Sequence, residues 1–258
     1  RLQVRDGLAE DNVALLEIPE QKQVRVAVFT RQPELLRPLF AANPRLAAEF
    51  APPEAYKADT DAEILILDRF RPTARPTRPA LYIMPPADGA PIPVARSGVS
   101  AKVTRWRADH PIANGIHNLD LKLDGATLFN PGSSAETVAE ADGGALVAAQ
   151  ANPPAVFLGV HPGIGSFRFE LAAPLLMANI FEWMAPQALR RWELDGESVG
   201  TIKVALDPNT DPKSIQVIGE DQQPLPFSIS ENTLQFYTAS RGTVRVRTGS
   251  RETVYSLT

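Results

Sequence analysis

Two residues of this 258-residue chain, Asp68 and His161, have the chemistry of a general acid–base pair. Each directly follows an apolar run typical of a buried strand, residues 63–67 (EILIL) and residues 155–160 (AVFLGV). In an open parallel sheet, ligands bind beyond the carboxyl ends of the strands. We therefore expect both side chains at one sheet edge, where the carboxylate could orient the imidazole as a general base. The alternative, which the sequence favours, is a turn-capping Asp68 and a His161 in a solvated loop.

The sequence offers this pair no nucleophile. It contains no cysteine, which excludes thiol catalysis, disulfides, iron–sulfur clusters and cysteine-ligated zinc in these residues. It also has no G-x-S-x-G elbow that would raise a serine above a sheet. We therefore assign no catalytic residue, and Asp68 and His161 stay as the candidates.

No cofactor site is predicted either. Gly163, Ile164 and Gly165 resemble the start of a dinucleotide-binding loop, but Arg168 stands where the next glycine would be. Residues 166–171 (SFRFEL) have the composition of a strand rather than of a helix that could hold phosphate at its N-terminus. We therefore predict a hairpin turn at 163–165, followed by a strand.

Metal and nucleic-acid binding are not expected. His110 and His117, with Asp109 and Asp120, could be drawn as a metal cluster. These four residues lie in a loop-like stretch, and their spacing matches no common metal-ligand motif. We therefore predict that they cap turns or are solvated. The net charge of −4 argues against a nucleic-acid surface, which would show clustered cations.

Alternating strands and helices are expected to position the candidate pair. The predicted strands are Val24–Phe29 and residues 45–50, 63–67, 81–84 and 155–160. One helix is predicted to begin at Pro33, and a second is predicted over residues 174–185. Residues 136–140 and 145–148 are predicted to form a β-hairpin. This alternation predicts an α/β fold of three layers around a mostly parallel sheet.

Proline marks the division into domains, because 20 of the 24 prolines lie in residues 1–190. Five short β-rich runs follow, which predict a small all-β sandwich; they are residues 201–206, 214–218, 234–237, 243–247 and 253–257. We place an α/β domain at 23–190 and the β domain at 191–258. Residues 1–22 contain a strand-like run, 13–18 (VALLEI), which is expected to pack with a β domain, either the C-terminal one or one further upstream.

The order of these elements resembles the class I glutamine amidotransferase-like domain. The resemblance is to the form in bacterial membrane-anchored proteins of the Bat (aerotolerance) type, which carry a von Willebrand factor A domain. It rests on the segments VRVAVF, EILILD, LYIMPP, HPIANGI, PPAVFLGV and PLLMANIFEWMAP, and on the tail from DPKSIQVIGE to GTVRV. It implies a flavodoxin-like sheet followed by a β-sandwich.

The same resemblance implies a catalytically degenerate domain. Active relatives place a cysteine at an elbow that falls here near Met84, Pro85 and Pro86, and they carry a His-Pro-Glu segment. In this chain no cysteine is present, and Gly163 follows His161 and Pro162 in place of the glutamate. Glutamine hydrolysis is therefore not expected.

The predicted function is non-catalytic binding or scaffolding within a larger membrane-anchored bacterial protein. Its expected partner is a protein or an upstream domain of the same parent chain, with no nucleic acid. The first residue is Arg rather than Met, which favours a piece of a longer chain. The sequence contains no run of about 18–20 apolar residues, the length that could span a bilayer. Membrane association, on the extracytoplasmic side, would therefore come from flanking segments. The alternatives are a small-ligand binder, or a hydrolase that uses Asp68 and His161.

Overall fold

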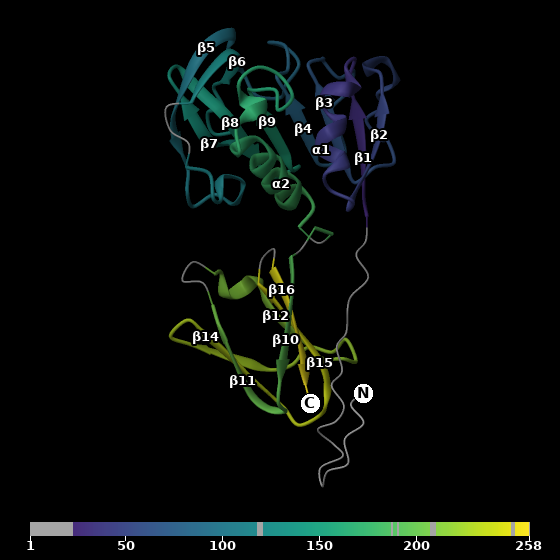
Figure 1. Ribbon diagram of the computed structural model, residues 1–258, viewed down its shortest axis with the longest axis vertical. Coiled ribbons are helices and arrows are strands. Elements are labelled where there is room, and N and C mark those ends of the chain that lie inside the picture. The colour runs from purple at the N-terminus through teal and green to yellow at the C-terminus, as the bar shows by residue number, and fades with distance from the viewer. Residues whose placement is uncertain are drawn as a thin grey trace. The chain divides into compact units, whose positions relative to one another are not determined.

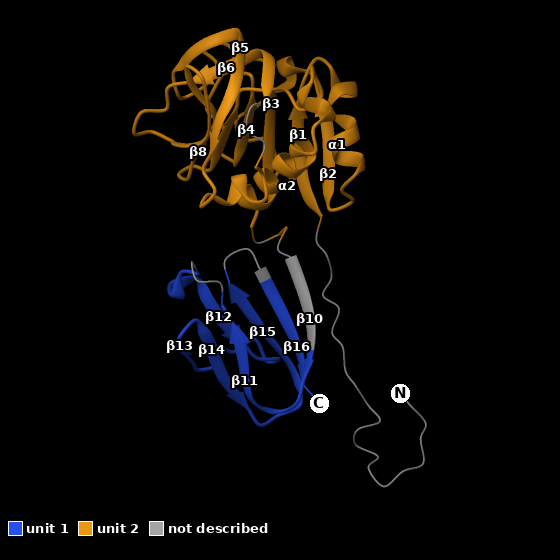
Figure 2. Cartoon of the chain, turned by 60° about the vertical axis from the view of Figure 1, so that its left-hand side comes forward, with its two compact units in different colours: residues 1–20, 190–258 blue, residues 21–189 orange. Residues whose placement is uncertain are grey.

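The computed structural model describes residues 23–117, 121–186, 188–189, 191–206, 210–248 and 251–257, with backbone only for 191–195 and 251. The elements are shown in Figure 1. The chain divides into two compact units (Figure 2). The larger is residues 21–189, and the described part of the smaller lies within residues 191–257.

The larger unit is built on one nine-stranded sheet of order β2-β1-β3-β4-β9-β8-β6-β5-β7. Its parallel strands are β1 (Val24–Phe29), β2 (Leu46–Ala51), β3 (Ile64–Asp68), β4 (Ala80–Ile83) and β9 (Ala155–Leu158). The antiparallel strands are β5 (Val94–Trp106), β6 (Lys122–Phe129), β7 (Glu136–Ala141) and β8 (Gly144–Gln150). β8 also pairs antiparallel with β9 and so joins the two halves.

The central parallel strands are apolar on both faces because each face packs against its own core. In β3, Ile64 and Ile66 point into one hydrophobic cluster, whereas Leu65 and Leu67 point into the other. This is the pattern of strands covered on both sides. Phe40 of α1 (Arg37–Ala41) and the buried face of α2 (Ala172–Met184) cover the first side.

The predicted three-layer, mostly parallel α/β fold is wrong. The described residues form two α-helices, both packed in the same hydrophobic cluster, and loop residues such as Tyr56 and Ile92 contribute to the cluster on the second side. Five of the nine strand pairings in the sheet are antiparallel. One physical reason is that three prolines, Pro72, Pro76 and Pro79, lie between β3 and β4 and prevent a crossover helix there. The sheet is therefore mixed and the unit is mostly β.

The smaller unit consists of two sheets around one core. Its strands are β10 (Arg191–Glu197), β11 (Gly200–Ala205), β12 (Ile215–Ile218), β13 (Phe227–Ser230), β14 (Thr233–Thr238), β15 (Gly242–Thr248) and β16 (Arg251–Leu257). They form the sheets β10-β16-β15-β12 and β11-β14-β13. Side chains of both sheets, among them Phe236 and Val246, share a single hydrophobic cluster. Within the described chain, no helix is long and apolar enough to cross a membrane.

Candidate functional site

The candidate site lies where four neighbouring parallel strands end. β1, β3, β4 and β9 are adjacent in the sheet and point the same way, so the residues that follow them meet at one edge. The backbone continues the pairing there, since Arg69 N donates to Ile83 O at 2.9 Å and Met84 N donates to Leu158 O at 2.8 Å. This edge brings the two predicted residues together, with 3.4 Å between His161 Nε2 and Asp68 Oδ1.

The Asp68 carboxylate is committed to protein donors. Thr30 Oγ1 donates to Oδ2 at 2.5 Å, and Arg69 donates through Nε to Oδ1 at 2.9 Å and through Nη2 to Oδ2 at 3.2 Å. Gln32 holds both donors in place, because its Oε1 accepts from Arg69 Nη2 at 2.7 Å and its backbone N–H donates to Thr30 Oγ1 at 3.0 Å. Asp68 is only 3% exposed. Its contacts therefore link the ends of β1 and β3.

His161 is held in one orientation at the end of β9. Its Nδ1 accepts a hydrogen bond from Gly163 N at 3.0 Å, so the neutral ring carries its proton on Nε2. That nitrogen is buried without a hydrogen bond of good geometry to the described residues, and it faces the carboxylate of Asp68. His161 is 1% exposed, so the predicted solvated loop is wrong.

Opposing effects set the pKa of Asp68. Burial is the largest single effect and raises it, whereas the facing His161 and the hydrogen bonds from Arg69 and Thr30 lower it. The combined lowering effects prevail, so the pKa lies below its ordinary value and Asp68 is an anion at neutral pH. The network therefore holds a buried negative charge between a hydroxyl, a guanidinium and an imidazole.

The backbone is strained at two of these strand ends. Arg69 has φ of 54° and Met84 has φ of 42°, which is the left-handed region for residues other than glycine. Such positions cost roughly 1–3 kcal/mol each and concentrate at functional sites. In this conformation the guanidinium of Arg69 folds back and pairs with the carboxylate of the adjacent Asp68. Met84 occupies the expected elbow position without a hydroxyl or an ionisable group.

The loop that follows His161 departs from the predicted strand. It passes so close to Leu35 that a Cβ on Gly163 would lie 2.2 Å from Leu35 O. Residues 166–171 contain a 3₁₀ helix, Phe167–Phe169, which leads into α2. The Phe167 side chain enters the core, whereas Phe169 is 75% exposed and Leu171 is 87% exposed. Phe167, Phe169 and Leu171 alternate in the sequence as they would in a strand, but Phe167 lies in the core and the other two lie at the surface.

The histidine cluster considered for metal does not assemble. His110 is buried, and its Nδ1 accepts from Ile112 N at 3.2 Å at the start of a short 3₁₀ helix. Burial lowers the pKa of His110. Asp109 pairs with an arginine, His117 is exposed, and Asp120 lies outside the described residues. No group of three or more potential ligands is arranged for a metal ion within the described part of the chain.

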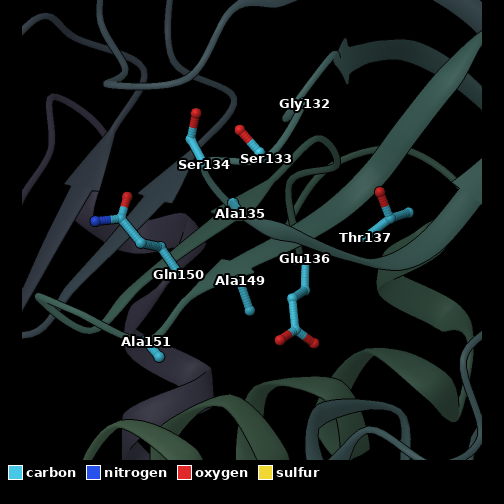
Figure 3. A pocket seen from close by; sticks show the side chains of 9 residues that line it. All are labelled: Gly132, Ser133, Ser134, Ala135, Glu136, Thr137, Ala149, Gln150 and Ala151. Atoms are coloured by element: carbon cyan, nitrogen blue, oxygen red, sulfur yellow. The ribbon is translucent and has the colours of Figure 1, made fainter.

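One pocket was not anticipated from the sequence. It has a volume of about 440 Å³ and lies between the turn at 132–135 and strands β7 and β8 (Figure 3). Its side chains diverge, because the hydroxyls of Ser133 and Ser134 point away from the Glu136 carboxylate. Glu136 is also paired with Arg107 at 2.7 Å. Neither Asp68 nor His161 lines this pocket, and its polar groups do not converge on a ligand as those of a typical small-molecule site do.

No protein-family model matches the chain, and no curated protein does. Solved structures match at low identity. The cytoplasmic protein STM3548 from Salmonella typhimurium is 11% identical with a TM-score of 0.45, over 62% of this chain and 98% of that one. The cytoplasmic protein STM1381 from Salmonella typhimurium LT2 is 8% identical with a TM-score of 0.50, over 62% and 99%. At such identity the latter shows a shared fold alone.

The predicted membership of the Bat-type amidotransferase-like family is wrong. No model of that family and no von Willebrand relative matches the chain. The mixed sheet and the two α-helices of the described residues differ from the three-layer domain that the resemblance implied. Most of the segments that suggested the family are buried strands and one apolar helix, whose composition follows from burial in many folds. HPIANGI contains only a short 3₁₀ helix, Pro111–Ala113.

Proposed function

We propose that the larger unit is a non-catalytic protein-binding module, and that the loop after His161 carries its binding surface. The observation behind this proposal is where the exposed apolar side chains lie. Among the described residues of the larger unit, the large hydrophobic side chains that are exposed are Ile164, Phe169 and Leu171, all in this one loop. The three positions lie within residues 164–171, and exposed hydrophobic patches mark interaction sites.

The helix that follows extends the same apolar character. Pro174 and Ala178 are exposed positions of α2, so the solvent side of this helix begins without polar residues. Glu182, one turn after Ala178 and partly exposed, is the first charged residue of α2. Between residues 164 and 178 the chain carries one cation, Arg168, which lies over the Phe169 ring at 4.3 Å. A nucleic-acid partner would require clustered cations, so the chemistry favours a protein partner with an apolar face.

The strand-end network supports binding rather than turnover. An acid–base pair needs the proximity that Asp68 and His161 have, but it also needs contact with substrate. Both side chains are almost fully buried, and the hydrogen-bonding atoms of the carboxylate face protein donors. In the binding module their role is to fix the ends of β1, β3 and β9, from the last of which the loop starts.

Photo-crosslinking followed by affinity measurement tests the binding surface. A photoreactive amino acid placed at Leu171 should give an adduct with one protein, whereas the same group at exposed Thr104 of β5 should not. The purified partner should then bind Leu171→Lys about 10- to 100-fold more weakly than the wild-type chain, because burying a leucine contributes about 1.5–3 kcal/mol. Thr104→Lys should bind normally. Equal adducts at both positions, or equal affinities of both variants, would contradict the proposal.

A turnover screen tests the alternative hydrolase. Chromogenic esters, amides and phosphate esters should be hydrolysed no faster with the wild-type chain than with His161→Ala. Hydrolysis that disappears in His161→Ala and persists in Leu171→Lys would refute the proposed binding module and support the alternative that the protein is a hydrolase. Attachment to a membrane through segments outside residues 1–258 stays a prediction, and fractionation of cells that express the parent reading frame would test it.

A further inference from the structure

Strand β13 forms an open edge of the smaller unit. It is the terminal strand of the sheet β11-β14-β13 and lies at the margin of this unit (Figure 2). On one side it pairs antiparallel with β14. Among the described residues no strand pairs with its other side, and the strand predicted at residues 13–18 lies outside them. An open edge presents unpaired backbone donors and acceptors, which proteins usually cover or protect.

The neighbouring strand β14 shows which backbone groups bond across to β13. Leu206 N donates to Asn232 O at 2.7 Å, so the backbone of Asn232 faces the β11 side. Along an antiparallel strand, successive residues direct their backbone groups to opposite sides. Thr233 and Gln235 therefore direct their N–H and C=O groups to β13.

Two residues of β13 direct their backbone groups to the open side. Ser230 and Ser228 are the register partners of Thr233 and Gln235, so they bond to β14. By the same alternation, the N–H and C=O groups of the other two residues of the strand, Phe227 and Ile229, point away from β14.

Phe227 and Ile229 also leave their side chains partly uncovered. Their register partners on β14, Phe236 and Leu234, are buried in the core between the two sheets. Cross-strand partners share a face of the sheet, so Phe227 and Ile229 point to the core side, yet each is 38% exposed. The core is therefore open along β13, beside the same two residues whose backbone groups point outward.

This edge lacks the charged side chains that usually keep edge strands apart. Residues 222–230 (QQPLPFSIS) contain no charged residue. The other edge strand of the same sheet, β11, carries an exposed lysine, Lys203, and lysine is a common protection of sheet edges. Of the two edges of this sheet, β13 is therefore the one suited to receive another strand.

We propose that β13 pairs antiparallel with β13 of a second copy of this chain, about a two-fold axis. A two-fold interface requires a surface that complements itself, and this edge does so in the register that uses both outward-facing residues. Phe227 then lies opposite Ile229 of the second copy and exchanges backbone hydrogen bonds with it, while Ser228 lies on the axis. Aromatic and β-branched side chains paired in this way stabilise antiparallel sheets. One short strand from each copy gives a small interface, so the dimer is weak and reversible, with Kd between about 1 µM and 1 mM.

Disulfide formation between copies tests the register in the full chain, which has no native cysteine. Ser228→Cys places two thiols on residues whose Cα atoms are about 4.5 Å apart across the axis, within the range of a disulfide. Gln235→Cys is the matched control, because Gln235 is exposed and is the register partner of Ser228 on β14. Its two copies would lie about 14 Å apart, three strand spacings. Ser228→Cys should form linked dimers at least about 10-fold faster than Gln235→Cys, and equal rates would overturn the proposal.

Analytical ultracentrifugation over a range of concentrations measures the association itself. The wild-type chain should show a reversible monomer–dimer equilibrium, and Ile229→Lys should weaken it at least about 10-fold, because a lysine protects a sheet edge. Tyr237→Lys should associate as the wild type does, since Tyr237 is also exposed and apolar but lies on β14 rather than at the edge. Leu171→Lys should do the same, which separates this interface from the loop after His161. A chain that is monomeric throughout, or association that Leu171→Lys removes and Ile229→Lys does not, would refute the pairing.

Hydrogen exchange of the unmodified chain, followed residue by residue with NMR, requires no variant to fold. The amides of Ser228 and Ser230 bond to β14 and should be protected at every concentration. Those of Phe227 and Ile229 should become protected only as the concentration rises through the Kd. Fast exchange of these two amides at every concentration would contradict the proposal. Protection that is already complete at low concentration would do so as well, in favour of a covering segment of the same chain.

Discussion

Replacing the buried carboxylate at the strand ends is the most direct test of its structural role. Asp68→Asn keeps the shape of the side chain but removes its charge. The carboxylate accepts from Thr30 and twice from Arg69, and it faces His161. An amide can still accept from Thr30, but its NH₂ group would face donors of Arg69 or the N–H of His161. The substitution therefore leaves positive charge without its counter-ion.

The magnitude follows from the burial of each partner. Breaking a buried ion pair on one side typically costs about 3–5 kcal/mol. Here the Arg69 side chain is 32% exposed and can recover part of its hydration, so we expect a loss of about 2–4 kcal/mol. For a unit of this size, about 1 kcal/mol corresponds to roughly 2–4 °C in Tm. The Tm of the larger unit is therefore expected to fall by roughly 4–16 °C.

Urea unfolding of the full chain, followed by hydrogen exchange in peptides from β3 and β9, measures this loss in the larger unit. Asp61→Asn is the matched control, because Asp61 also accepts two hydrogen bonds from an arginine, Arg25, but lies on the surface. The control should leave the urea midpoint unchanged, since exposed ion pairs contribute little. If Asp68→Asn also unfolds at the wild-type midpoint, the strand-end network does not stabilise the fold and our account of the site is wrong.

The pH dependence provides an internal check on the same reasoning. Because the pKa of Asp68 is lowered in the fold, the unfolded chain binds its proton more readily. The stabilisation is complete above the pKa of the unfolded carboxyl group, about 3.9, and it is lost as the pH falls towards the lower value in the fold. Asp68→Asn should therefore lose less stability than the wild-type chain between about pH 5 and pH 2.5. Parallel profiles of the two proteins would contradict the assigned direction.

Three further outcomes are expected. Phe167→Ala should cost about 3–5 kcal/mol because Phe167 is buried, whereas Phe169→Ala, two residues along, should change the free energy of unfolding by less than about 1 kcal/mol; urea titrations compare them. Gly159→Ala should lose more than about 2 kcal/mol in the same assay, because its Cβ would lie 1.9 Å from Thr127 O. Burial lowers the pKa of His110, so its NMR resonance should titrate below about pH 6.5, and stability should fall as the pH drops through that range.

The buried parallel strands could be predicted from the sequence because both of their faces are apolar. Val24–Phe29 is found with the predicted bounds, and the strand predicted at 63–67 is shifted by one residue. β5 was missed because it has no regular alternation: residues 95–98 are all exposed, and its pairing with β6 is interrupted by register shifts. The layers could not be predicted, because local patterns do not report which strands turn antiparallel.

The candidate site shows the same division between local and global information. Asp68 and His161 could be paired from the sequence because each follows a buried parallel strand, and such ends meet at one edge. Their burial could not be predicted, because it depends on Thr30 and Arg69 closing over the carboxylate. The alternation of Phe167, Phe169 and Leu171 predicts a strand after His161, whereas the structure has a loop with a 3₁₀ helix there. Alternation cannot distinguish side chains that enter the core from side chains left at the surface.

The rigidity of the strand ends bears directly on how such a loop would bind. A flexible loop loses conformational freedom when a partner orders it, at about 0.5–1.5 kcal/mol for each immobilised side chain. Here the loop is fixed before binding: Gly163 is bonded to His161 and packed against the Leu35 backbone, and Phe167 is anchored in the core. The strain at Arg69 is tolerated because the same network over-determines that conformation. The network thus fixes the loop that carries the proposed binding surface, and this would lower the conformational cost of binding a partner.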